Sequence, residues 1–439
     1  MQLNPFTLKQ FKLSTFVTPV LTLVLILALT LAFLPNAVNA KSIAITNATV
    51  YTVASQGILE QATVVMDEGK ILAVYVAGEV PEQLDTDEIL DAKGRILTPG
   101  FIASMNSLGL VEVGAVARTR DGSDKKADIT FDASLAFNPK STLIPYSRKG
   151  GITNNIVAPE SGEGLFSGQT FAVNLSGEFN SIIAKKNAVL IYLGSESKGS
   201  RAQKLQLLDN KFADAINKSS KKKGQKKNKK DEEAPALKRK EQVINALLAG
   251  EKPLLAYADR ATDLLALLAL KKKYAIDLVL VGASDAVLVA DEIADANVPV
   301  ILSSVDNLPS SFDSLHGSLT NMAILAKAGV KLMLMTKGDS HNINRLRFDA
   351  GIAVANGLSK TDAFSALTAN VADVFKLNAG RIVAGKNADL VLWSADPFEI
   401  RSKVDLMWIN GKSVSTQSRQ DALRNRYTKQ TNMPRAYSK

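Results

Sequence analysis

The sequence predicts an α/β protein with a second region rich in β-strands, and two observations predict it. In the middle of the chain, short apolar runs alternate with longer stretches of helical periodicity. Toward both ends the alternation stops, and short β-rich runs separated by turn residues take its place. The length of 439 residues suits one large domain, or a barrel with an accessory domain.

The middle of the chain contains the predicted strands and the helices that follow several of them. The strands are nearly continuous apolar runs, as burial on both faces requires, and we expect them at residues 152–158, 188–193, 253–258, 277–281, 299–302 and 331–335. Helical patterns follow at residues 262–273, 285–296, about 319–328 and about 343–356. This order is typical of parallel strands with helices outside them, in a barrel or in a doubly wound sheet.

The two β-rich ends are predicted to form one accessory β-sandwich. Strands are expected at residues 43–45, 49–53, 62–66 and 70–74, and again at 388–393 and 404–412. Asp67-Glu68-Gly69 and Asn410-Gly411 are tight-turn signals of hairpins. The predicted boundaries are 41–97 and 380–414 for the sandwich, 98–379 for the central region and 415–439 for a C-terminal tail.

Residues 1–40 have the layout of a secretory signal peptide that is cleaved after Ala40. Lys9 and Lys12 precede an apolar run at residues 20–34, and the small residues of a cleavage site follow. The alternative is an uncleaved anchor, but this run of about 15 residues is shorter than the roughly 20 that span a bilayer. No later segment is long and apolar enough to span. We therefore expect an exported protein, periplasmic or extracellular, with no integral membrane span after signal cleavage.

Composition excludes several kinds of site. The chain has no cysteine, so disulfides, thiolate metal sites and a cysteine nucleophile are excluded. Its net charge of +10 comes mostly from lysines within residues 218–240, which we expect to form a disordered insert. This stretch has no aromatic residues among its lysines, so a nucleic-acid partner is not expected. Weak attraction to an anionic surface is the alternative role.

Four separated segments resemble the metal-dependent amidohydrolase superfamily, and they occur in that family's order. They are Thr98-Pro99-Gly100-Phe101-Ile102, Thr368-Ala369-Asn370-Val371-Ala372, Gly385-Lys386-Asn387-Ala388-Asp389-Leu390-Val391 and residues 404–412. The chain is most similar to imidazolonepropionase-like exported amidohydrolases. The resemblance implies a TIM-type (β/α)₈ barrel with a β-sandwich domain formed by both chain ends, in agreement with the pattern of the elements.

The resemblance also implies a chemistry. Active members of the family are hydrolases of carbon–nitrogen bonds, often in cyclic amides or aminated rings, and some cleave peptides. One or two divalent metal ions, zinc or another, activate water, and imidazoles and carboxylates hold the metal. Such a site would lie at the carboxyl ends of the barrel strands.

This chain departs from the family at the metal-binding positions. Where relatives have Asp-x-His-x-His after the first barrel strand, it has Ala103, Met105 and Ser107. The later histidine positions correspond to Tyr257 and Gly282, and the bridging Lys or Glu would fall within the apolar run at 188–193. Methionine and serine are poor ligands for zinc or manganese. We therefore expect no bound metal and no cofactor.

Asp339, His341 and Asp259 remain as weak catalytic candidates. Asp339 and His341 are two residues apart after the last predicted barrel strand, a spacing that places both on one face for acid–base work. The alternative is that Asp339 or Ser340 caps the next helix, with His341 in its first turn. By the resemblance, either Asp339 or Lys337 stands at the position of the family's catalytic Asp. Asp259 and Arg260 suggest a salt bridge at the barrel mouth or a substrate contact.

Other polar residues are expected to be structural rather than functional. Glu112 and Glu160 follow predicted strands but fit loop positions, and His316 fits a structural or surface position. The Gly/Ser-rich loop at 161–169 lacks the Gly-Lys-Ser/Thr pattern that binds phosphate. No Gly-x-Ser-x-Gly elbow is present, which argues against serine hydrolysis.

The sequence therefore predicts an exported hydrolase-family protein with impaired catalysis, in effect a pseudoenzyme. Three hypotheses stay open. The chain is a hydrolase with atypical catalytic residues, a non-catalytic partner of an active amidohydrolase relative or of its own copies, or a protein that binds a small-molecule ligand without turnover.

Overall fold

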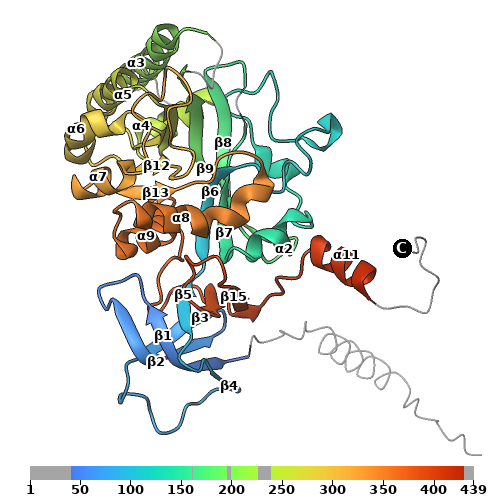
Figure 1. Cartoon of the computed structure of the whole chain (residues 1–439). Coiled ribbons are helices and arrows are strands. Elements are labelled where there is room, and N and C mark those ends of the chain that lie inside the picture. The colour runs from blue at the N-terminus through green and yellow to red at the C-terminus, as the bar shows by residue number, and fades with distance from the viewer. Residues whose placement is uncertain (1–40, 161, 195–198, 226–238, 430–439) are drawn as a thin grey trace, which may run out of the picture. The chain divides into compact units, whose positions relative to one another are not determined.

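The structure, a computed structural model, describes residues 41–160, 162–194, 199–225 and 239–429 (Figure 1). The predicted signal peptide at 1–40 lies outside these residues. Across the described ranges, no helix combines the length and the apolar character needed to cross a bilayer. The described chain contains two eight-stranded sheets, one formed by the middle of the sequence and one by its two ends.

The central sheet curves into a nearly closed barrel, which confirms the predicted TIM-type fold class. Its strands, in order around the sheet, are β6 (Phe101–Asn106), β7 (Ile152–Val157), β8 (Phe166–Asn174), β9 (Ile182–Tyr192), β10 (Leu254–Ala258), β11 (Leu278–Gly282), β12 (Val300–Leu302) and β13 (Leu332–Leu334). All six strands predicted in this region are present. Strand β8 is antiparallel to both of its neighbours, and the other pairs are parallel.

Helices cover the outside of the barrel where the sequence predicts them. Those that follow the later strands are α5 (Ala261–Tyr274), α6 (Ala290–Asp295), α7 (Asn321–Lys327) and α8 (Leu346–Ala355). The remaining helices are α2 (Leu143–Arg148), α3 (Arg201–Gln225), α4 (Arg239–Leu248), α9 (Lys360–Leu367), α10 (Ala369–Val374) and α11 (Arg419–Thr428).

Both ends of the predicted lysine-rich insert are helical. We expected disorder over 218–240, but α3 continues to Gln225 and α4 begins at Arg239. Lysine has a high helix propensity, and an ion pair joins Lys218 of α3 to Glu241 of α4, with 2.7 Å between Nζ and Oε1. Residues 226–238 lie outside the described ranges.

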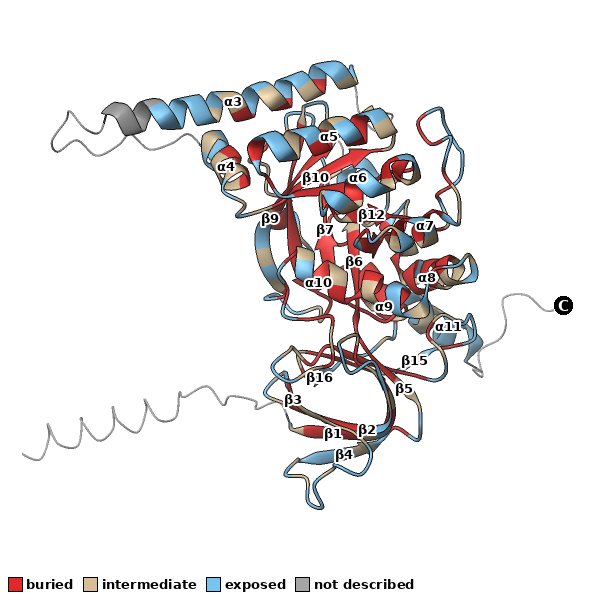
Figure 2. Cartoon of the chain, turned by 90° about the vertical axis from the view of Figure 1, so that its left-hand side faces the viewer, coloured by how far each residue is buried: buried red, intermediate tan, exposed pale blue. Residues whose placement is uncertain are grey.

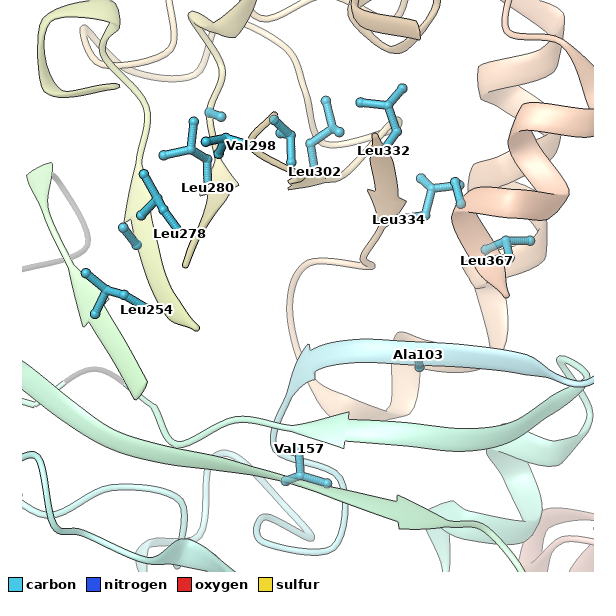
Figure 3. Close-up of a cluster of buried hydrophobic side chains, with 14 of the residues drawn as sticks. Ala103, Val157, Leu254, Leu278, Leu280, Val298, Leu302, Leu332, Leu334 and Leu367 are labelled. Carbon is cyan, nitrogen blue, oxygen red and sulfur yellow. The ribbon is translucent and has the colours of Figure 1, made fainter. Parts of the chain in front are cut away.

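Two buried layers explain the apolar strands. In β10, Leu254 and Ala256 face the helices, whereas Leu255 and Tyr257 face the barrel interior. Strands β11 to β13 repeat this alternation, so both faces of each strand are buried, as the burial colours of Figure 2 show. Figure 3 shows the outer layer, with Leu278, Leu280, Leu302, Leu332 and Leu334 among its members. Burial on both faces is the property that the apolar runs predicted.

Helix α10 and the segment after it fill the barrel interior between its first and last strands. Val371, Ala372 and Phe375 belong to the same interior cluster as Ile102 of β6 and Met333 of β13. The amide of Asn370 donates to the carbonyl of Leu332 at 2.8 Å, which fixes α10 against β13. The segment Thr368–Ala372, recognised in the sequence, therefore belongs to the core of the barrel.

The second sheet combines both chain ends, as predicted. Its strands follow the order β16 (Lys412–Ser413), β15 (Val404–Ile409), β14 (Leu390–Trp393), β5 (Ile96–Pro99), β1 (Ile43–Tyr51), β2 (Ile58–Asp67) and β3 (Lys70–Tyr75), and β4 (Glu88–Asp91) also pairs with β1. Strands β4 and β5 pair with successive parts of the same edge of β1. The two chain ends thus form one branched sheet of eight strands.

Buried polar groups join this sheet to the barrel. The fully buried carboxylate of Asp389 accepts hydrogen bonds from the Asn154 amide in β7 and from the backbone N–H of Asn410, both at 2.8 Å. Within the mixed sheet, the Trp393 indole of β14 donates to the hydroxyl of Thr98 in β5 at 2.9 Å. The buried guanidinium of Arg347 on α8 donates to carbonyls of the segment after β14, those of Pro397, Glu399 and Ser402. The contacts of Asp389 and Arg347 hold the mixed sheet against the barrel.

Candidate functional site

The mouth of the barrel, at the carboxyl ends of the parallel strands, is packed with large side chains. Met105, Tyr192, Tyr257 and Met335 lie at these strand ends and belong to the interior cluster. The rings of Tyr192 and Tyr257 stack, with their centroids 5.3 Å apart and 18° between their planes. The position where this fold places active sites therefore has an aromatic centre.

The turn after β11 allows Tyr257 to lie where it does. Gly282 has a φ of +81°, and a Cβ atom there would lie 2.9 Å from Cε1 of Tyr257 and 2.9 Å from Oδ1 of Asp259. Ala283, which follows, is also left-handed, with a φ of 50°. A side chain at 282 is therefore incompatible with the present positions of Tyr257 and Asp259.

Asp259 stabilises this same turn. Its Oδ1 accepts hydrogen bonds from the backbone N–H and the hydroxyl of Ser284, at 3.2 and 2.8 Å, and its backbone carbonyl accepts from the N–H of Asp285 at 2.9 Å. The predicted salt bridge at the mouth exists, but Arg260 makes it with Asp313, with 2.6 Å between Nε and Oδ1. Asp259 thus shapes the mouth, and a substrate contact by it stays a prediction.

Arg260 belongs to a group of four charges beside the mouth. Arg201, at the start of α3, pairs with Asp313 and with Asp263 of α5, and its Nε lies 3.1 Å from Oδ2 of Asp263. Burial raises the pKa of Asp263, and the charges of Arg201 and Arg260 oppose that shift. The two arginines and the two carboxylates balance in charge. Their ion pairs join α3, α5 and the loop that contains Asp313.

Lys204 brings an ammonium group to the end of β9. It is only 6% exposed, and its Nζ donates to the backbone carbonyls of Tyr192 and Gly164 at 3.2 and 3.3 Å. Burial lowers the pKa of Lys204. Sequence reasoning missed this residue, because a lysine is rarely buried in a helix that carries other lysines exposed, here Lys211 and Lys218.

Asp339 and His341 lie at the surface. Oδ2 of Asp339 is 3.8 Å from Nδ1 of His341, and the two side chains are 68% and 57% exposed. Asp339 occupies the N-cap position of the 3₁₀ helix Ser340–Arg345, with His341 in its first turn, but its carboxylate makes no capping hydrogen bond. Asp339 and His341 thus lie at the start of a helix, as one of the two predictions stated. Their acid–base role stays a prediction.

The loops after the first and last barrel strands meet at this point. The hydroxyl oxygens of Ser107 and Ser340 are 3.2 Å apart. A Cβ at Gly114 would lie 3.2 Å from Oδ1 of Asp339. Ser107 therefore contacts the loop that follows the last barrel strand.

The other polar residues singled out in the sequence have local roles. Glu112 accepts hydrogen bonds from Asn138 and Ser141 at 3.2 and 2.9 Å. The backbone N–H of Glu160 donates to the carbonyl of Gly122 at 2.9 Å. Nδ1 of the half-exposed His316 lies 2.9 Å from Oδ1 of Asp285.

The buried amides of Asn106 and Asn155 were missed. They form a reciprocal pair between β6 and β7, with donor–acceptor distances of 2.7 and 2.9 Å. A signal was present, because Thr153-Asn154-Asn155 is a polar triplet inside a buried strand. Such residues persist in a core only when they find partners.

The residues of the mouth do not fit a zinc ion. No cluster of three or more His, Asp and Glu side chains able to hold a metal occurs among the residues that the structure describes. Zinc requires several imidazole or carboxylate ligands, whereas this mouth offers stacked phenol rings and thioethers. The arrangement favours stacking and van der Waals contact.

Comparison with known proteins finds a family similarity in the carboxy-terminal part of the chain. Residues 254–414 match the family model described as "Amidohydrolase family". None of the curated proteins compared matches the chain. The carboxy-terminal part of the chain is therefore similar in sequence to the amidohydrolase family.

Solved structures cover nearly the whole described chain. An amidohydrolase from Thermotoga maritima superposes with a TM-score of 0.76 at 25% identity, over 85% of this chain and 99% of that one. A prolidase complexed with N-methylphosphonate-L-proline gives 0.52 at 14% identity, over 86% and 100%. Atrazine chlorohydrolase from Arthrobacter aurescens, as a mutant complexed with zinc and atraton, gives 0.51 at 16%, over 87% and 98%. The last two support the fold alone.

Gly282→Ala tests the packing of the mouth. Gly385 is the matched control, because its φ of +84° is also left-handed but nothing lies within 4 Å of its Cβ position. Overpacking costs about 1–3 kcal/mol, so we expect Gly282→Ala to lower the free energy of unfolding by about 2 kcal/mol more than Gly385→Ala does. Urea unfolding measures both, and equal losses would contradict the described contact.

A buried carboxyl group on α8 predicts that the stability of the fold depends on pH. Asp349 of α8 is 5% exposed, and its Oδ2 accepts a hydrogen bond from Thr336 at 2.7 Å. Burial raises its pKa from 3.8 to about 6, against the opposing effect of that hydrogen bond. Between these values the folded protein holds a proton that the unfolded chain has released, so this contribution to stability is lost as the pH rises.

Asp349→Asn is therefore expected to remove part of the pH dependence of stability. A shift of roughly two pKa units corresponds to about 3 kcal/mol. Between pH 4 and pH 7, the free energy of unfolding of the natural protein should fall by about this amount relative to the variant. Denaturant unfolding across this range measures it, with the exposed Asp277→Asn as control. Parallel profiles for the natural protein and Asp349→Asn would refute the assignment.

Proposed function

We propose that this chain is an exported, imidazolonepropionase-like member of the hydrolases that act on carbon–nitrogen bonds other than peptide bonds, and that its metal-dependent reaction is impaired. One observation carries the proposal. The stacked rings of Tyr192 and Tyr257 occupy the centre of the mouth. By the resemblance, Tyr257 and Gly282 stand at or near positions where relatives have metal-binding histidines.

The mutual fit of the mouth residues supports a coordinated loss of the metal ligands. A histidine at 282 would bring its Cβ to 2.9 Å from the ring of Tyr257. Met105 contributes a thioether to the same apolar cluster, and Ser107 contacts Ser340. Restoring one histidine would leave a clash or an incomplete ligand set. The site has become an apolar core that excludes the ligands.

The polar candidates offer limited support for hydrolysis without a metal. A general base needs to reach the proton that it removes. Asp259 is held by Ser284, and Asp339 and His341 point into solvent at the outer loops. An atypical mechanism would require these loops to move over the mouth. Binding without efficient turnover is the simpler function.

Elemental analysis of the mature protein, purified without chelator, is the decisive measurement. We expect zinc and manganese well below one ion per chain, even after incubation with either metal. Atrazine chlorohydrolase, which has been solved with zinc, serves as the positive control in parallel. A near-stoichiometric transition metal in the natural protein would overturn the proposal.

A second candidate is a non-catalytic partner of an active amidohydrolase, and the loop between β12 and α7 favours it. This loop, residues 303–320, is longer than the roughly 12–15 residues beyond which irregular loops are usually functional. Asp313 and His316 hold it to the barrel through Arg260 and Asp285. Yet Phe312 is 85% exposed, and Leu308 and Leu315 are also exposed. A fixed loop with outward apolar side chains is typical of an interface.

The double variant Phe312→Ser/Leu315→Ser tests this candidate. An affinity-tagged mature chain should co-purify from its own cells with an amidohydrolase-family chain, identified by mass spectrometry, and the variant should lose most of it because the apolar contact is gone. Leu135→Ser/Phe179→Ser is the matched control, because both side chains are exposed and lie elsewhere in the chain. Equal recovery by both variants, or no such chain with the natural protein, would refute a partner at this loop.

A further inference from the structure

A cavity of about 270 Å³ lies away from the barrel mouth, between the turn that joins β1 to β2 and helix α9. In Figures 1 and 2 these elements face each other where the mixed sheet approaches the barrel. Tyr51, Val53 and Ile58 line one side, and Lys360, Phe364 and Ser365 of α9 line the other. The size is at the small end for a ligand pocket, so it suits a molecule of about one ring.

The floor of the cavity is aromatic. The ring of Tyr51 lies 4.7 Å from that of the buried Phe364, and Phe364 stacks on Phe398 at 4.6 Å. Aromatic rings prefer to meet other rings in tilted or offset contacts, which add about 0.5–1.5 kcal/mol beyond the buried area. A ring placed in the cavity would extend a row of rings that the core already holds.

The backbone of one wall of the cavity is strained at Val53, and the side chain of Ile58 at the rim is exposed. Val53 has a φ of +51°, a left-handed conformation that a β-branched residue rarely adopts. Two backbone hydrogen bonds of the preceding residue hold Val53 in this conformation. The N–H of Thr52 donates to the carbonyl of Gly57 at 3.1 Å, and the N–H of Ile382 donates to the carbonyl of Thr52 at 2.9 Å. Ile58 at the rim is 53% exposed. Backbone strain of this kind gathers at ligand clamps.

The rim supplies a positive group. Nζ of Lys360 lies 5.4 Å from the centroid of the Tyr51 ring and pairs with Asp396. An ammonium has several N–H donors, so one carboxylate partner leaves donors for another acceptor. The cavity thus combines a flat apolar floor with one cationic edge.

We propose that this cavity binds a monocyclic aromatic carboxylate, with its ring against Tyr51 and Phe364 and its carboxylate at Lys360. The site is separate from the mouth, so the inference goes beyond the proposed function and does not depend on it. Because Asp396 competes for the same ammonium, removing its charge should strengthen the binding of the carboxylate.

Calorimetric titration of the mature protein with three probes tests the proposal. Benzoate should bind saturably at one site per chain, and cyclohexanecarboxylate, which has the charge without the aromatic ring, about 2- to 10-fold more weakly. Benzyl alcohol has the aromatic ring without the charge, so its affinity measures the contribution of the ring alone. Lys360→Met should weaken benzoate and leave benzyl alcohol unchanged, and Asp396→Asn should strengthen benzoate alone. Lys327→Met, on α7, is the matched control.

Ser365→Phe places a ring in the cavity and should reduce the affinity for benzoate at least tenfold. If circular dichroism shows that this variant does not fold, Lys360→Met and Asp396→Asn still decide the outcome. The proposal fails if no aromatic probe binds saturably at millimolar concentration, if cyclohexanecarboxylate binds as well as benzoate, or if the Lys360 and Asp396 variants change both aromatic probes equally.

Discussion

The buried carboxylate of Asp389 joins the two sheets, and much of the remaining structure depends on its position. Its two oxygens accept from Asn154 in the barrel and from the Asn410 turn in the mixed sheet, and its own carbonyl accepts from Gly100, between β5 and β6. Burial raises its pKa, and these hydrogen bonds oppose the shift. A buried acid is tolerated only when its hydrogen bonds are satisfied. This one residue therefore holds the start of the first barrel strand beside both sheets.

At the mouth, packing and backbone conformation depend on each other. Tyr257 requires a glycine at 282, the left-handed turn after β11 requires Asp259 to hold Ser284, and Tyr192 stacks on Tyr257. Closely packed cores respond to a single change by strain or by a void. A side chain added at 282 would therefore force Tyr257, Asp259 or the turn itself to move.

Much of the fold could be predicted from the sequence, because burial on both faces gives an apolar run whose length matches a strand. The turns Asp67-Glu68-Gly69 and Asn410-Gly411 were equally clear. The antiparallel β8 was missed, since its direction depends on hydrogen bonds to distant strands. Sequence identified Arg260 as a charge at the mouth but could not choose Asp313 as its partner, 53 residues away. The stacking of Tyr192 on Tyr257 could not be predicted for the same reason, because the two residues are distant in the sequence.

The mixed sheet has a consequence for the order in which the protein assembles. Strand β5 pairs with β1 on one side and with β14 on the other, and β14 begins only at Leu390. Contacts between residues so far apart in the chain form slowly, because a long loop must close first. Until then the N-terminal strands present an open edge, the kind of surface on which chains aggregate. Pairing with β14 therefore also closes an edge that would otherwise be open to other chains.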